Sequence, residues 1–252
     1  MNYLPFDQRT ADTQYRDRLR LILNEGEMVK ETQQGVGALT YMAPPPMRFR
    51  LENGVPLITE RKAPFWRGAV GELLAFINGA RRTEELEAFG CKWWSSWLTE
   101  EKCRKRGLEP GDNGPGSYGA AFHDFPTAEG PAFNQFEEIV KQIKEEPQLR
   151  SHIITPWIPQ YTIRVKSRQQ KVVVAPCHGW IHLRVLDNKL TLHMFQRSGD
   201  VPVGVPSNMV QYGALLMMLA HATGTEPYEN IPTISDAHIF VDQVPAVELM
   251  LS

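Results

Sequence analysis

The chain has 252 residues, of which 42% are hydrophobic and 22% are charged, and its formal net charge is −2. This length can bury a sizeable core, and the near-neutral charge lacks the basic surface expected for a nucleic-acid or anionic-membrane partner. The longest apolar stretch is too short to span a bilayer and the charged N-terminus lacks a signal-peptide core, so we expect a cytoplasmic protein. Sparse cysteines, without a CxxC pair, indicate a reducing compartment: Cys91, Cys103 and Cys177.

The first half of the chain predicts helices separated by short strands. Residues 14–24 predict a helix ending before Gly26, and residues 47–59 predict two short strands around the Asn53-Gly54 turn. A mostly apolar helix is predicted from residue 65 to about Gly79. The segment that follows, residues 100–119, is rich in glycine and charge, and predicts either a mobile surface insertion or a loop that closes over a site.

The second half predicts helices and mostly antiparallel strands. An amphipathic helix is expected to end at Pro147, and residues 179–196 alternate around Asp187-Asn188 as a hairpin. Residues 207–224 predict a core helix with Ser207 as N-cap and Gly224 as C-cap, and residues 235–242 a late strand. The order predicts an α+β fold with a large sheet packed against buried helices. Because no linker is visible, we expect a single domain over residues 1–252.

Several polar residues have the chemistry of a nucleotide site, although each has an ordinary explanation. Cys177 beside His178 fits a nucleophile, but one cysteine after an apolar run is more often a small hydrophobe. Arg197 beside Ser198 fits a phosphate site or a surface ion pair, and Asn208 fits recognition of a uracil-like edge or a helix cap. Glu72 lies in an apolar helix, where a carboxylate needs either a functional role or an arginine partner.

Taken together, these motifs resemble the thymidylate synthase superfamily. The order "APCH", "QRSGD", "GVPSN" and "DAHIF" is similar to the family's PCH nucleophile, QRS-x-D segment, G-x-P-x-N helix start and D-x-H-x-Y strand. Upstream, "GELLAFINGA", "KWWSSW", "GPGSYG" and "RSHIITPW" resemble further family segments, so the resemblance runs from about residue 14 to residue 248. It implies the family fold, with a large mixed or antiparallel sheet that forms a dimer interface.

The resemblance implies one-carbon transfer to C5 of a pyrimidine nucleoside monophosphate. Cys177 would add to C6 as a thiolate and make C5 nucleophilic, and Glu72 would organise the water network for proton transfers. Tyr118 and His178 would line the same network. The one-carbon donor would be 5,10-methylenetetrahydrofolate, and no metal is expected.

The resemblance also assigns binding roles. The implied nucleotide ligands are Gln196, Arg197, Ser198, Asn208 for the base edge, and His238 for the ribose. The folate would meet Asp200 at its pterin, Trp94 and Lys62. Arg150 would reach the phosphate of the other subunit in a homodimer.

Some positions depart from the family pattern. Gln33 and Ser151 replace two phosphate arginines, with Lys166 and Arg168 as possible substitutes, and Phe240 replaces the tyrosine of the sugar site. Ser207 replaces a phenylalanine beside Asn208, and the chain stops at Ser252 without the family's usual C-terminal tail. A closed, dry site is needed to reduce the transferred carbon, whereas water capture gives a hydroxymethyl group.

These departures favour a pyrimidine nucleotide hydroxymethylase over a thymidylate synthase that converts dUMP to dTMP with dihydrofolate release. Uracil and cytosine, and ribose and deoxyribose, all stay open, because known deoxycytidylate hydroxymethylases carry aspartate at the Asn208 position but an asparagine amide can rotate. A catalytically silent nucleotide-binding homologue is a third reading, against which the retained Cys177 and Glu72 argue. A cysteine hydrolase is a weaker one, since neighbours on one strand would point Cys177 and His178 to opposite faces.

Overall fold

The computed structural model describes residues 3–10 and 12–252, whose positions group into two compact units. The first unit combines the chain up to Pro64 with the chain from Leu183 onward. The second unit is the continuous segment Phe65–His182. The expectation of a single domain over residues 1–252 stays a prediction, and each unit is described separately below.

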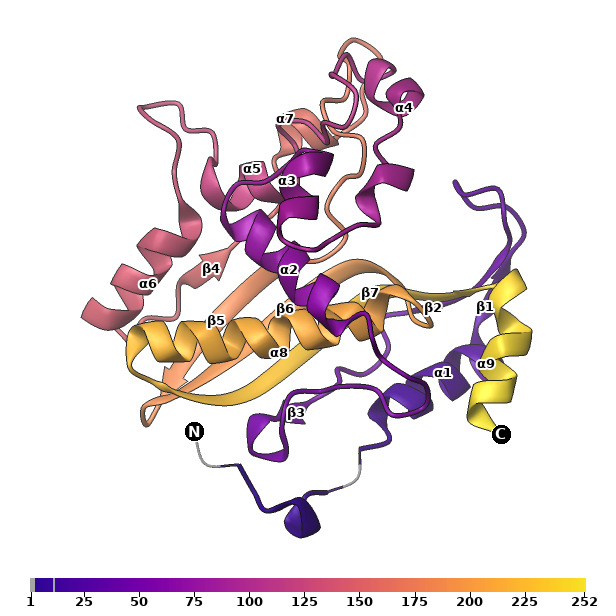
Figure 1. Cartoon of the computed structure of the whole chain (residues 1–252), viewed down its shortest axis with the longest axis vertical. Coiled ribbons are helices and arrows are strands. Elements are labelled where there is room, and N and C mark those ends of the chain that lie inside the picture. Colours follow the sequence, from indigo (N-terminus) through magenta and orange to yellow (C-terminus); the bar gives the residue numbers. More distant parts are fainter. Residues whose placement is uncertain (1–2, 11) are drawn as a thin grey trace. The chain divides into compact units, whose positions relative to one another are not determined.

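The first unit is built on a mixed sheet (Figure 1). Its strands are β1 (Glu27–Val29), β2 (Ala38–Met42), β3 (Phe49–Arg50), β6 (Lys189–Asp200), β7 (Glu226–Phe240) and the part of β5 (Trp180–Leu186) from Leu183 onward. β2 is antiparallel to β1 and to the end of β7, while β6 runs parallel to β7. Asp187 and Asn188 have φ angles of 48° and 61°, so the hairpin predicted between β5 and β6 is confirmed.

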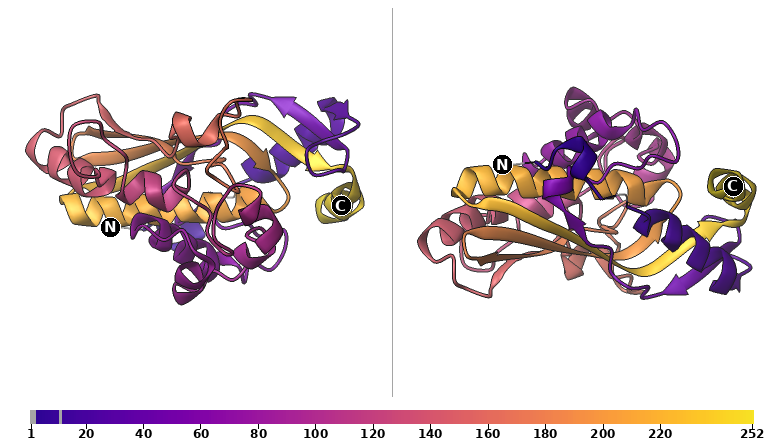
Figure 2. Two further views of the ribbon diagram at one scale, coloured as in Figure 1. Left: turned by 90° about the horizontal axis from the view of Figure 1, so that it is seen from above. Right: turned by 90° about the horizontal axis from the view of Figure 1, so that it is seen from below.

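The parallel pair β6–β7 needs a crossover connection, and helix α8 (Gly204–Thr223) supplies it. α8 packs on both strands and runs along one face of them in both views of Figure 2. Gly224 ends the helix with φ 73°, as predicted. The prediction of Ser207 as N-cap was wrong, because Pro206 fits within the first helical turn and the helix starts earlier, after Val203.

Shorter helical segments complete the first unit. They are η1 (Phe6–Gln8), α1 (Gln14–Glu25), η2 (Leu51–Asn53), η4 (Val241–Gln243) and α9 (Val244–Leu251). The helix predicted over residues 14–24 is confirmed, and it buries Leu19 and Ile22 against β2 and β7. The second strand predicted after Gly54 was wrong: Gly54 has φ 100° after the η2 turn, and the chain beyond it lies against Gly213 of α8 instead of pairing with β3.

The second unit is mainly helical (Figure 1). Its elements are α2 (Trp66–Ile77), α3 (Thr83–Ala88), η3 (Trp94–Ser96), α4 (Glu100–Arg104), α5 (Tyr118–His123), α6 (Gln135–Glu145), β4 (His152–Ile154) and α7 (Pro159–Thr162). Both predicted helices are confirmed, and Gly79 has φ 83° just after α2.

The segment 100–119 is not a featureless loop. It contains α4 and buries Cys103, Asp112 and Asn113, so it is part of the packed unit. Helices and a large mixed sheet together confirm the predicted α+β class. Within residues 3–10 and 12–252, no helix has both the length and the apolar character needed to cross a membrane.

Candidate active site

Cys177 lies in an ordered loop before β5, and not at a strand end as its apolar context suggested. The loop is tied to Asn113, whose Oδ1 accepts the Val174 N–H at 2.8 Å and whose backbone oxygen accepts the Val173 N–H at 3.1 Å. These hydrogen bonds join the apolar run before Cys177 to the loop of Asn113 and not to a neighbouring strand. The run therefore forms no strand, although its residue types resemble one. The argument that strand geometry separates Cys177 from His178 therefore fails.

Tyr118, the first residue of α5, holds the Cys177-His178 peptide. Its phenolic oxygen accepts the Cys177 N–H at 2.6 Å and the His178 N–H at 3.4 Å. The Tyr118 ring is stacked between Phe76 of α2, with ring centroids 4.6 Å apart, and the His178 imidazole, at 4.7 Å. The Sγ of half-buried Cys177 lies 3.7 Å from the Ala175 carbonyl oxygen. The nucleophile predicted from sequence thus lies on a backbone fixed by a buried side chain.

Glu72 points from α2 into the interior, where its side chain is hydrogen-bonded. Its Oε1 accepts the indole N–H of Trp93 at 2.8 Å and the indole N–H of Trp94. The Cys91 thiol lies 3.8 Å from the same oxygen. Burial, together with the negative charge of Glu72, raises the pKa of Cys91 well above its usual range, so this thiol stays protonated and acts as a donor. The carboxylate, for which sequence suggested a functional role or an arginine partner, accepts hydrogen bonds from two indoles.

A row of aromatic rings connects the surroundings of Glu72 with those of Cys177 within the second unit. Phe76 packs edge-on against Trp94, with ring centroids 5.8 Å apart, and also stacks on the Tyr118 ring. Tyr118 in turn stacks on His178. The structure therefore brings Glu72, Trp94, Tyr118, Cys177 and His178 into one continuous cluster.

Five of the predicted ligands in the first unit lie near the ends of β6 and β7: Gln196, Arg197, Ser198, Asp200 and His238. In the parallel register, Ser198 lies opposite Asp236 and Asp200 opposite His238. Gln196 is buried, and its Nε2 donates to the Ser198 carbonyl oxygen at 3.0 Å. Side chains on adjacent strands at such positions are near neighbours, so the QRSGD residues of β6 and the DAHIF residues of β7 lie side by side near the ends of these two inner strands.

Two carboxylates near these strand ends have pKa values shifted in opposite directions. His238 Nδ1 lies 3.6 Å from Asp236, and this contact, with the Thr40 hydroxyl 2.6 Å away, lowers the pKa of Asp236. Asp200 is shielded from water, which raises its pKa, although Gln243 Nε2 donates to both of its oxygens at 3.2 Å and 3.1 Å. Asp200 also accepts the Val203 N–H at the start of α8.

Asn208 lies in the first turns of α8 and is buried. Its Nδ2 donates to Gln211 Oε1 at 2.9 Å, one turn further along the helix. Because both side chains belong to the same rigid helix, Gln211 restrains the rotation of the Asn208 amide.

The remaining predicted residues are exposed. Lys62 lies in the loop that ends the first part of the first unit, and Gln33 lies in the turn between β1 and β2. Arg150 and Ser151 precede β4 in the second unit, where the Arg150 carbonyl oxygen accepts from His182 Nε2 at 3.1 Å. Their expected roles toward phosphate or folate stay predictions.

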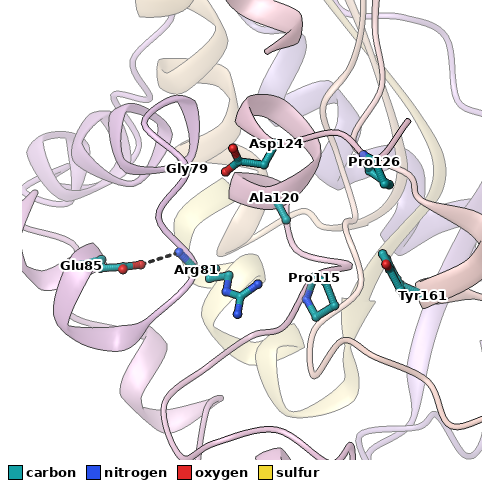
Figure 3. A pocket seen from close by; sticks show the side chains of 8 residues that line it. All are labelled: Gly79, Arg81, Glu85, Pro115, Ala120, Asp124, Pro126 and Tyr161. Carbon is teal, nitrogen blue, oxygen red and sulfur yellow. Dashed lines mark hydrogen bonds between the residues drawn. The ribbon is translucent and has the colours of Figure 1, made fainter. Parts of the chain in front are cut away.

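A cavity of about 300 Å³ opens elsewhere in the second unit (Figure 3). Figure 3 shows charged side chains on its wall, with the Arg81 backbone N–H bonded to the Glu85 carboxylate. Its lining residues are Gly79, Arg81, Glu85, Pro115, Ala120, Asp124, Pro126 and Tyr161. None of the residues predicted from sequence to act in catalysis or binding is among them.

Sequence reasoning missed several residues that hold the predicted ones. Phe76, Cys91 and Trp93 contact the predicted catalytic residues, and Gln211 and Gln243 contact the predicted binding residues. Trp93 had a visible signal, since it directly precedes Trp94. The others lie far along the chain from their partners or look like ordinary core and helix positions.

Comparison with known proteins agrees with this arrangement. A family model described as thymidylate synthase matches residues 13–252. The thymidylate synthase of Equine herpesvirus 2 (strain 86/87) is 33% identical over 252 residues, which covers 96% of this chain and 84% of the viral protein.

This chain belongs to the thymidylate synthase family. Membership confirms the resemblance drawn from the motifs and is consistent with the α+β fold. The chemistry of the thymidylate synthase family is folate-dependent methyl transfer to C5 of a pyrimidine. The family motifs are divided between the two units, with the predicted catalytic residues in the second and the predicted ligands of β6, β7 and α8 in the first.

Proposed function

We propose that the protein transfers a one-carbon unit from 5,10-methylenetetrahydrofolate to C5 of a pyrimidine nucleoside monophosphate and releases a hydroxymethylated nucleotide. The observation that carries this proposal is the Tyr118–Cys177 hydrogen bond, which fixes the peptide of the nucleophile beside His178. The buried Glu72 carboxylate, joined to Tyr118 through the aromatic row, supplies a group for proton transfer in the same unit.

The proposed chemistry begins at the Cys177 thiolate, which adds to C6 and moves an electron pair onto C5. C5 then forms a bond to the methylene carbon of the folate substrate, while one of that carbon's two bonds to nitrogen breaks and the freed nitrogen takes up a proton. Loss of the C5 proton, through water organised by Glu72, and cleavage of the second carbon–nitrogen bond leave an exocyclic methylene on the ring. Water adds to this methylene and Cys177 departs from C6, so tetrahydrofolate leaves without being oxidised.

The first unit offers side chains that fit both substrates. Arg197 and Ser198 at the end of β6 can donate to a phosphate, and His238 can bond to a ribose hydroxyl. Asn208, restrained by Gln211, presents a donor and an acceptor to the base. The shielded Asp200 carboxylate has acceptor oxygens suited to the N–H groups of a pterin.

Substitutions at the nucleotide-binding positions favour a changed substrate and product. Phe240 ends β7 with its ring edge against His238, at a centroid distance of 5.0 Å, where the family pattern has a tyrosine hydroxyl. Gln33 and Ser151 replace charged donors, which weakens the family's usual phosphate site. A nucleotide site altered at both the sugar and the phosphate supports a relative with its own substrate, as expected for a hydroxymethylase.

Thymidylate synthase activity itself is the second candidate, because the herpesvirus relative bears that name and covers nearly the whole chain. Incubation with methylenetetrahydrofolate and dUMP, UMP, dCMP or CMP separates the two. A hydroxymethyl-mass product without dihydrofolate absorbance supports the proposal, and a methyl-mass product with dihydrofolate supports the synthase. No product from any of the four, with nucleotide still bound, would favour the silent homologue. Cys177→Ala is the control that must abolish either product while keeping nucleotide binding.

We also propose a homodimer in which Arg150 reaches the phosphate bound by the other subunit. Arg150 is exposed, so it is available to a second copy of the chain. Cys177→Ala and Arg150→Ala are each expected to be inactive alone. Mixed after co-refolding, they should regain activity at the one site that combines an intact Cys177 with an intact Arg150. No recovery in mixed dimers would count against the cross-subunit role.

A further inference from the structure

Two glycines on α2 allow the chain before Trp94 to lie directly on the helix backbone. A Cβ atom at Gly71 would stand 2.0 Å from the Phe89 carbonyl oxygen. A Cβ atom at Gly68 would stand 2.7 Å from Cζ3 and 2.9 Å from Cη2 of the Trp93 indole. Because residues three apart share a helix face, Gly68 and Gly71 form one flat strip that receives residues 89–93.

The close approach to Gly68 sets the direction of the Trp93 indole. Although the Trp93 residue is 37% exposed, its Nε1 lies 2.8 Å from Glu72 Oε1, one turn along α2 from Gly68. An indole N–H only donates, so Glu72 Oε1 is the acceptor both for Trp93 and for Trp94. The protonated Cys91 thiol faces the same oxygen. One oxygen of the carboxylate is therefore surrounded by donors from a single short segment.

We infer that Trp93 is a positioning residue for Glu72: its indole, seated on Gly68, fixes Oε1 and thereby assigns the proton transfers of the reaction to Oε2. The inference rests on the proposed function, in which Glu72 organises these proton transfers. In the segment KWWSSW, the family resemblance assigns a folate role to Trp94 and no role to Trp93. A carboxylate held by two indoles keeps one orientation, whereas one held by a single indole can rotate about its last bond.

The hydrogen bond itself is tested first, without any activity. In the ¹H–¹⁵N spectrum of the full chain, Trp93→Phe assigns the Trp93 indole signal. Glu72→Gln is expected to move the Trp93 and Trp94 indole signals, because an amide oxygen accepts more weakly than a carboxylate. Trp66 is the internal control, since its indole is exposed at the start of α2 and packs on Arg67. A Trp93 signal that does not respond would overturn the inference.

The catalytic consequence is measured by release of tritium from C5 of the nucleotide, a step shared by hydroxymethylation and methylation. Trp93→Phe keeps an aromatic ring but removes the donor, and is expected to lower kcat roughly ten-fold while KM for nucleotide and folate changes by less than about two-fold. Trp66→Phe is the matched control and should keep the wild-type kcat. Gly68→Ala displaces the indole without changing it, so it should reproduce the loss of kcat.

The outcomes separate this inference from the proposed function. Wild-type protein that releases no tritium with any of the four nucleotides would refute the proposed function, and the spectrum would still decide the Trp93 contact. Active wild-type protein with an unchanged kcat in Trp93→Phe would overturn the inference alone. A raised folate KM at constant kcat would also overturn it, because Trp93 would then be a ligand contact. Thermal unfolding of each variant checks that the lower kcat belongs to folded protein.

Discussion

Replacing Tyr118 by phenylalanine removes the single oxygen that accepts the Cys177 and His178 N–H groups, while the ring can still stack between Phe76 and His178. The contact at 2.6 Å carries most of the effect, since the one at 3.4 Å is long for a hydrogen bond. Loss of an acceptor for a buried donor costs about 1–3 kcal/mol of folding free energy. For a chain of this size that lowers Tm by roughly 2–12 °C.

The larger effect is expected on catalysis, because the Tyr118 oxygen orients the peptide of Cys177, the proposed nucleophile. A thiol displaced by about 1 Å from its attack position loses up to roughly a hundred-fold in rate. We therefore expect kcat for C5 tritium release to fall roughly ten- to a hundred-fold in Tyr118→Phe, with little change in nucleotide KM. Tyr161→Phe is the matched control, since it removes a phenol from the cavity wall of the same unit. Wild-type kcat in Tyr118→Phe, or an equal loss in Tyr161→Phe, would refute the reasoning.

Three further predictions concern the first unit. Phe240→Tyr returns a hydroxyl to the sugar site and is expected to lower KM for the preferred nucleotide roughly five-fold, from one added hydrogen bond of about 1 kcal/mol; an unchanged KM for all four nucleotides would contradict this role. Because His238 lowers the pKa of Asp236, this carboxylate stabilises the fold above about pH 4 and the stabilisation is lost as the pH falls further. In urea titrations, the unfolding free energy of Asp236→Asn should therefore fall less steeply with decreasing pH than that of the wild type. An equally steep fall would argue against the contact between His238 and Asp236. The Gln243 side chain donates to Asp200 and so lowers its pKa, and Gln243→Leu should therefore raise that pKa further. Because the proposed pterin contact needs the ionised carboxylate, the pH below which folate KM increases should move upward. An unshifted KM–pH profile would exclude this contact.

Local patterns predicted much of the fold, because they depend on neighbours in the chain. The hairpin at Asp187-Asn188 and the end of α8 at Gly224 follow from backbone conformations that few residues adopt. The strand predicted after Gly54 was wrong because this segment depends on a contact with a distant part of the chain. Its alternation resembles a strand, but it packs on Gly213, more than a hundred residues away in sequence, and this contact is invisible to a local pattern. The start of α8 was likewise misplaced, since Ser207 is a good cap that the longer helix does not use.

Sequence patterns pointed to the reactive residues of the proposed site, but they did not point to the residues that support them. Cys177 and Glu72 have side chains whose chemistry is recognisable in any context. Trp93 and Gln243 are ordinary residues until the fold places their N–H groups on a carboxylate. The apolar run before Cys177 also suggested a strand where the structure has a loop. The reason is that its hydrogen-bond partner, Asn113, lies in a loop far away in the sequence.

The way in which the units divide the chain has a consequence for how the protein is made. The segment Phe65–His182 is continuous, so a growing chain contains every residue of the Cys177 cluster before the first unit can be completed. The first unit must wait, because β2 near the beginning pairs with the end of β7, about two hundred residues later. Since compact units tend to fold as they emerge from the ribosome, we expect the segment with Cys177 and Glu72 to fold before the sheet with Arg197 and Ser198 is complete. A ribosome stalled late enough for His182 to have left the exit tunnel would thus display the second unit before β7 has joined the sheet.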